Sequence, residues 1–133
     1  MTAVKIGVIG GGFGTQHLQG YGATENAEVV AFCQRTPDKA EATAKAFGVP
    51  HVYTDYRELL AHPGLDAVSI VAPPHLHAEM VQAALEQGLH LLCEKPLAMD
   101  AAQAETMLSQ AEAAGRVHMT AFNHRHIPAL AYM

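Results

Sequence analysis

The sequence is poor in charge, and above all in positive charge. Of its 133 residues 16% are charged, with 8 Lys and Arg against 13 Asp and Glu, which gives a formal net charge of −5 at pH 7. A chain of this kind lacks the basic surface that nucleic-acid binding requires. No apolar run approaches the roughly 18 residues of a membrane span, and the first residues hold no segment typical of a signal peptide. We therefore expect a cytoplasmic protein that binds neither nucleic acid nor membranes.

Cysteine is equally scarce. Cys33 and Cys93 stand far apart in apolar segments, too few for a disulfide framework, so a reducing compartment is expected. The pairs His75-x-His77 and His124-x-His126 lack a third ligand at a suitable spacing, so we expect no metal site. Hydrophobic residues make up 50% of the chain, enough to form the core of one domain.

Apolar segments of strand length alternate with segments of helical period along the chain. The predicted strands cover residues 4–9, 28–33, 52–53, 67–71, 89–93 and 117–121, and the predicted helices 13–21, 37–47, 55–61, 76–87 and 101–114. Helix caps are expected at Thr36, Asp55 and Asp100. Strand–helix–strand units with short connections imply a single α/β domain with a doubly wound, mostly parallel sheet. Ligands bind such sheets at the carboxyl ends of the strands.

The turn after the first strand reads Gly10-Gly11-Gly12-Phe13-Gly14-Thr15 and opens a helix, which is the setting of a dinucleotide-binding fingerprint. Gly10 allows a tight turn, and Gly12 lets the backbone approach a pyrophosphate held by the helix N-terminus. Thr15 stands at the third fingerprint position, with Gly14 before it. We expect a dinucleotide to bind at Gly10, Gly12, Phe13, Gly14 and Thr15. The alternative is a glycine-rich turn without a ligand.

The second strand is followed by Gln34-Arg35-Thr36, where NAD-binding proteins carry an acidic residue for the ribose diol. Without a carboxylate to repel it, a 2′-phosphate can lie against Arg35 and Thr36. This pattern favours NADP over NAD. In the alternative, Arg35 is solvated and Gln34 hydrogen-bonds the diol of NAD.

Two further strand ends carry candidate residues. After the fourth strand, Ala72 and Pro73 begin a proline-stiffened loop beside the expected ligand, and His77 could bond the cofactor or the neighbouring loop. After the fifth strand, Lys95 suits a site that polarises a carbonyl or stabilises an alkoxide. Glu94 could accept a ribose hydroxyl or balance that lysine, and the Lys95–Pro96 bond is a candidate for cis. The alternative for this pair is a surface ion pair before a turn.

Four motifs occur in order, Gly10-x-Gly12, Pro73-Pro74-His75-Leu76-His77, Glu94-Lys95-Pro96 and Phe122-Asn123-His124-Arg125. Together they resemble the N-terminal domain of the Gfo/Idh/MocA oxidoreductases, the glucose-fructose oxidoreductase and inositol dehydrogenase family. The resemblance covers essentially the whole chain. It implies a dinucleotide-binding Rossmann domain over residues 1–123, with residues 124–133 starting the connection to a C-terminal α/β substrate domain that this chain does not contain.

The resemblance also implies an activity. Members of the family transfer a hydride between NAD(P) and a hydroxyl or carbonyl carbon of a sugar, inositol or related compound. By similarity Lys95 would be catalytic beside the nicotinamide, Glu94 would bind the nicotinamide ribose, and Asn123 and Arg125 would contact the cofactor. The family's acid/base histidine lies in the second domain, so we expect this chain to bind cofactor without turnover. The parent protein would be a homo-oligomer.

Two alternatives of a different class stay open. The first is a non-catalytic module of the same fold that senses NAD(P) or binds a protein, because fold alone does not fix function. The second is a domain that dimerises through residues 127–133.

Overall fold

The computed structural model describes residues 2–131. Within this range the chain forms one six-stranded sheet in the order β3-β2-β1-β4-β5-β6, and all neighbouring strands are parallel. The strands are β1 (Val4–Ile9), β2 (Ala27–Cys33), β3 (His51–Tyr53), β4 (Ala67–Ile70), β5 (His90–Glu94) and β6 (His118–Ala121). The predicted fold class is confirmed, and the strand order reverses between β1 and β4. Met1, Tyr132 and Met133, which the predicted domain and the predicted dimerising tail include, lie outside the described residues.

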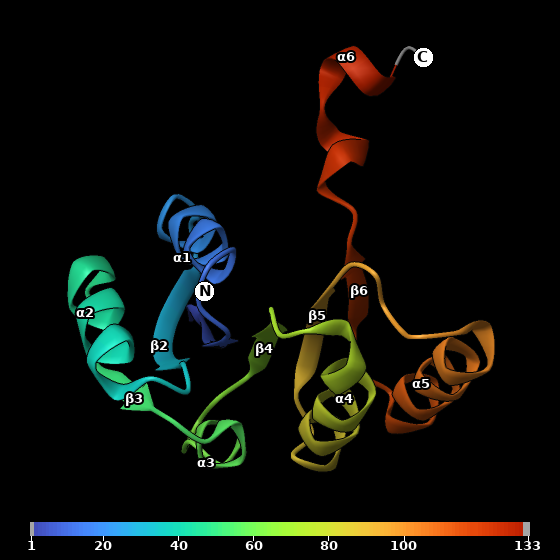
Figure 1. Ribbon diagram of the computed structural model, residues 1–133, viewed down its shortest axis with the longest axis horizontal. Helices are drawn as coiled ribbons and strands as arrows, with labels where there is room; N and C mark the ends of the chain where they lie inside the picture. Colours follow the sequence, from blue (N-terminus) through green and yellow to red (C-terminus); the bar gives the residue numbers. More distant parts are fainter. Residues whose placement is uncertain (1, 132–133) are drawn as a thin grey trace.

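Helices cover both faces of the sheet (Figure 1). One face carries α1 (Gly14–Gly22) and α2 (Pro37–Phe47), and the other carries α3 (Tyr56–Leu60), α4 (His77–Glu86) and α5 (Ala101–Ala114). Short 3₁₀ turns precede α4 at Pro74–Leu76 and follow β6 at Asn123–His126. After the second turn, α6 (Pro128–Ala131) extends away from the rest of the domain (Figure 1).

Each face of the sheet has its own apolar core. Val8, Leu18 and Phe32 are buried under α1 and α2, while Leu59 and Ile70 are buried under the opposite helices. A parallel strand covered on both faces has no solvent side, which explains the nearly continuous apolar sequences of β1 and β2.

Two of the three predicted helix caps form their side-chain bonds. Asp55 accepts a hydrogen bond from the Arg57 N–H at 2.8 Å, and Asp100 accepts one from the Gln103 N–H at 2.8 Å. Thr36 stands at the cap position of α2 but forms no side-chain cap bond, so that prediction was wrong in its chemistry. Thr36 instead lines the cavity described below.

The predicted boundaries differ from the observed ones by at most one residue at either end. The difference that bears on the site is at β5, which ends at Glu94 rather than Cys93. Glu94 is therefore held by the sheet itself and not by the following turn. Residues 2–131 include no helix with the length and apolar character needed to cross a lipid bilayer.

Candidate cofactor-binding site

The glycine loop after β1 packs tightly at one end and is open at the other. Gly10 has φ +115°, and a Cβ placed on it would lie 2.1 Å from the carbonyl oxygen of Val71. Its N–H donates to the Cys33 carbonyl at 2.9 Å, which fastens the loop to β2. Gly12 has φ +55°, and a Cβ there would meet no atom within 4 Å. The loop thus needs glycine at position 10 for packing and offers bare backbone to solvent at position 12.

The start of α1 is closed by bonds within the loop. The Gly14 N–H donates to the Gly11 carbonyl at 3.0 Å, and the Thr15 N–H and hydroxyl both donate to the Gly12 carbonyl, at 3.1 and 2.8 Å. Thr15 can replace the third fingerprint glycine because its side chain folds back onto its own turn. Phe13 occupies the cap position and is half-exposed.

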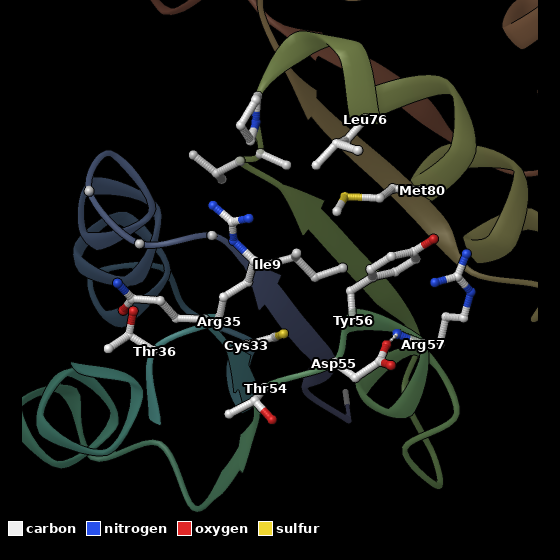
Figure 2. A pocket seen from close by; sticks show the side chains of 17 residues that line it. Ile9, Cys33, Arg35, Thr36, Thr54, Asp55, Tyr56, Arg57, Leu76 and Met80 are labelled. Atoms are coloured by element: carbon white, nitrogen blue, oxygen red, sulfur yellow. Dashed lines mark hydrogen bonds between the residues drawn. The ribbon is translucent and has the colours of Figure 1, made fainter. Parts of the chain in front are cut away.

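A cavity of about 560 Å³ opens beside this loop, at the carboxyl ends of the strands (Figure 2). Seven of the predicted cofactor-binding residues line it: Gly10, Gly12, Gln34, Arg35, Thr36, Ala72 and Pro73. The fold therefore brings together, in one cavity, predicted residues that follow β1, β2 and β4.

The cavity has a further wall that the sequence prediction missed. This wall consists of residues 54–57, which follow β3, and of Leu76 and Met80 from the segment after β4. The lining is completed by residues next to the predicted ones, Ile9, Gly11, Cys33 and Val71. Figure 2 shows Tyr56 and Arg57 on one side of the cavity and Thr36 on the other. The rule that ligands bind at strand ends would have found residues 54–57, because β3 was itself a predicted strand.

Charge in the cavity is arranged around the end of β2. The Gln34 side-chain amide packs on the glycine loop, where a Cβ on Gly11 would lie 2.5 Å from its nitrogen. Arg35 is exposed in the wall, so the end of β2 presents a guanidinium and no carboxylate. The one carboxylate of the described lining, Asp55, already caps α3.

The wall formed by α3 and α4 is held by a polar cluster. The Tyr56 hydroxyl and the Arg57 guanidinium both donate to the same oxygen of Glu79, and the guanidinium carbon lies 4.6 Å from the centre of the Tyr56 ring. Burial, followed by the hydrogen bond and negative charge of Glu79, raises the pKa of Tyr56 to about 12. Tyr56 is therefore a neutral phenol at this end of the cavity.

His77 is fully buried and does not line the cavity. Its Nε2 lies 2.7 Å from the Ala72 carbonyl oxygen, and its Nδ1 lies 3.0 Å from that of Pro96. Of the two roles weighed for His77, the structure shows the bond to the neighbouring loops. It joins the turn after β4 to the turn after β5.

Glu94 and Lys95 lie at the end of β5, outside the cavity lining. Glu94 is 8% exposed, and Lys95 is exposed. One carboxylate oxygen lies 2.8 Å from Nε2 of His17, and the other accepts the Lys95 N–H at 3.1 Å. The Lys95–Pro96 bond is cis, as the sequence suggested.

The sequence prediction missed the partners of Glu94. Nδ1 of His17 lies 3.1 Å from the Ser69 hydroxyl, and the Tyr21 hydroxyl lies 2.7 Å from the same oxygen. Serine, histidine and a carboxylate also form hydrolase triads. Here Ser69 has no exposed surface and lies in a central strand, so it cannot reach a substrate as a nucleophile.

The remaining predicted residues lie apart from the cavity. Asn123 and Arg125 are exposed on the turn after β6, and Phe13, Gly14 and Thr15 form the start of α1 without lining the cavity. Across residues 2–131 no three His, Cys, Asp or Glu side chains are grouped so as to hold a metal ion.

The family model described as "Oxidoreductase family, NAD-binding Rossmann fold" matches residues 4–122. The chain belongs to the Gfo/Idh/MocA oxidoreductase family. Residues 4–122 therefore form an NAD-binding Rossmann domain of that family.

The relatives that this chain matches are longer proteins in which the matched domain is one part. Levoglucosan dehydrogenase of Pseudarthrobacter phenanthrenivorans is 36% identical over 98% of this chain, which spans 36% of that protein. A 3-ketoreductase mutant from Actinomadura kijaniata, solved with TDP-benzene and NADP, is 33% identical, with a TM-score of 0.91 over 98% of this chain and 42% of its own. Scyllo-inositol dehydrogenase from Lactobacillus casei, solved with NAD(H) and scyllo-inositol, is 26% identical, with a TM-score of 0.90 over 98% of this chain and 39% of its own. The chain thus spans well under half of each of these relatives.

Proposed function

We propose that this chain is the NADP-binding domain of an oxidoreductase that transfers a hydride between the cofactor and a hydroxyl or carbonyl carbon of a sugar, inositol or related compound. The observation that carries the proposal is the cavity at the reversal of strand order, with bare glycine backbone on one side and Arg35 on another. Open backbone at Gly12 fits a pyrophosphate, which needs N–H donors and room for close approach.

Arg35 and Thr36 support NADP rather than NAD. In this proposal they hold the 2′-phosphate, because a guanidinium pairs with phosphate through charge-assisted hydrogen bonds. Gln34 packs on the glycine loop and leaves the end of β2 without the carboxylate that would repel such a group. Relatives solved with NADP and with NAD(H) both occur, so this choice rests on residues 34–36.

The direct test is calorimetric titration of this chain with NADP and with NAD. We expect tighter binding of NADP, and Arg35→Ala should weaken NADP about 10- to 100-fold with little change for NAD. Lys45→Ala, which removes a cation from the last turn of α2 outside the cavity lining, is the matched control. Tighter binding of NAD would overturn the role of Arg35 and keep the domain assignment. Binding of neither dinucleotide would contradict the proposed function.

The roles at the other strand ends form the second part of the proposal. We place Glu94 at the nicotinamide ribose, Lys95 beside the reacting oxygen, and Asn123 and Arg125 at the cofactor in a protein that also carries a substrate domain. In such a protein Lys95→Ala should abolish most turnover with little loss of cofactor affinity, because its charge matters most where charge develops on oxygen. Unchanged turnover would overturn the catalytic role of Lys95.

Several expectations stay predictions. They are the domain limits at residues 1–123 and 124–133, binding without turnover by this chain, a homo-oligomeric parent and a cytoplasmic location.

A further inference from the structure

The sequence prediction missed a row of four hydrogen-bonded side chains, Tyr21–Ser69–His17–Glu94, which we call the buried chain. Its members come from α1, β4 and β5, which are separated by 52 positions between His17 and Ser69 and 77 between His17 and Glu94. The side chains of His17 and Glu94 are 8% and 10% exposed. A polar chain buried at this depth costs free energy unless each member is bonded, and none of the buried side-chain polar atoms in residues 2–131 lacks a partner.

The hydrogen bonds of the buried chain can all be donated in one direction, from Tyr21 towards Glu94 on the serine side and from His17 to Glu94. With Glu94 ionised and His17 neutral, Nε2 of His17 donates to Glu94, because an ionised carboxylate can only accept, and Nδ1 accepts from the Ser69 hydroxyl. Ser69 in turn accepts from Tyr21. Burial raises the pKa of Tyr21 more than its bond to Ser69 lowers it, so the phenol keeps its proton and remains a donor.

This direction fixes both the ring and the carboxylate. In this arrangement the Ser69 hydroxyl donates to Nδ1, so the tautomer of His17 carries its proton on Nε2, towards Glu94. Phe13 and Tyr21 lie edge-on to the His17 ring, with centroids at 5.9 and 6.4 Å, and limit its rotation. Glu94 is then held from both sides, by His17 on one oxygen and by the Lys95 N–H on the other.

We infer that His17 is a positioning residue, which orients the Glu94 carboxylate towards the nicotinamide half of the bound dinucleotide. The inference rests on the proposed function, because it assigns Glu94 to that half of the cofactor. His17 itself does not line the cavity; it belongs to α1, which begins at the glycine loop, and its side chain bonds Glu94 at the end of β5. It thereby couples the loop proposed to bind the pyrophosphate to the strand that carries Glu94 and Lys95.

The test separates the two halves of the cofactor. NADP carries both halves, whereas 2′,5′-ADP carries the same phosphorylated adenosine without the second ribose or the nicotinamide. The amide nitrogen of glutamine can reach the position of Nε2 and donate to Glu94, whereas asparagine reaches only the position of Nδ1 and keeps at most the bond to Ser69. We expect His17→Asn to weaken NADP about tenfold and His17→Gln by less than about threefold, with 2′,5′-ADP unchanged in both.

Each other result has a defined meaning. Equal NADP binding by wild type and His17→Asn overturns the inference, as does equal weakening of NADP and 2′,5′-ADP, which would show a general structural role. A Gln variant as weak as the Asn variant also overturns it, because the donor to Glu94 would then be irrelevant. Binding of neither NADP nor NAD to the wild-type chain would instead contradict the proposed function.

A double-mutant cycle gives a second measurement on variants whose folding is checked by denaturant unfolding. If His17 acts through Glu94, His17→Asn should cost nothing further in NADP affinity once Glu94→Ala is present. Additive losses would overturn the inference.

Discussion

The two halves of the carboxyl edge of the sheet are built in opposite ways. Around the ends of β1, β2 and β3 and the loop after β4, the edge is a cavity, framed in part by a glycine loop that is bonded within itself and to β2. Between α1 and the strands β4 and β5, it is filled by hydrogen-bonded polar side chains, from Tyr21 to Glu94. At the cavity, glycines without side chains leave the backbone open to a ligand. In the buried chain, hydrogen bonds fix how the side chains are oriented. A phosphate group needs the first arrangement, and a directed contact to a ribose or a reacting oxygen needs the second.

The sharpest way to break the first half is Gly10→Ala. A Cβ there would lie 2.1 Å from the Val71 carbonyl oxygen, at a φ of +115° that L-residues rarely adopt, and backbone cannot move aside as a flexible side chain can. We expect a loss of at least about 3 kcal/mol in the free energy of unfolding, measured by urea denaturation.

Gly20→Ala is the matched control for this variant. Gly20 lies within α1, where a Cβ would meet nothing within 4 Å and φ is not positive. Alanine there should leave the free energy of unfolding unchanged or raise it by up to about 1 kcal/mol. A Gly10→Ala variant as stable as this control would contradict the packing role of the loop.

The second half should respond more gently, through its hydrogen bonds. Ser69→Ala removes the buried hydroxyl that joins Tyr21 to His17, and leaves the partly buried Tyr21 hydroxyl and Nδ1 of His17 without that partner. We expect a loss of about 1 to 3 kcal/mol in the free energy of unfolding, because a buried polar group loses its partner. Ser109→Ala on the exposed surface of α5 should change it by less than about 0.5 kcal/mol. Equal values for the two serines would show that the buried chain adds nothing to stability.

The same contrast explains what the sequence could predict. The glycine loop, the parallel sheet and the residues after β2 and β4 follow from local patterns, since each needs only a strand, a turn and the start of a helix. Even Thr15 in place of the third glycine did not disturb the prediction, because its hydroxyl bonds to its own turn. Patterns that can be read in one segment therefore predicted the strands, the turns and the placement of these residues at strand ends.

The buried chain could not be found in this way. His17 looks like an ordinary polar residue on a short helix, and Ser69 interrupts an otherwise apolar strand without any local reason. Their meaning arises only when β1, β4 and β5 lie side by side and bring α1 against the end of β5. His77 is a milder case, because its neighbouring-loop role was weighed but its fully buried position between two turns was not.

The last prediction concerns two buried cysteines at the ends of β2 and β5. Cys33 ends β2 beneath the cavity, and Cys93 precedes Glu94 in β5; burial, the first cause for each, raises the pKa of both thiols to about 12. Above about pH 9 the unfolded chain loses these protons while the folded chain keeps them, so stability should fall between about pH 9 and pH 12 and be unaffected below. At about pH 8 both thiols should react with iodoacetamide far more slowly than in urea, as followed by mass spectrometry. Faster labelling of Cys33 alone would show that solvent reaches this cysteine through the cavity, whereas Cys93 stays protected. The two regions would then differ in solvent access to their buried thiols as well as in their polar groups.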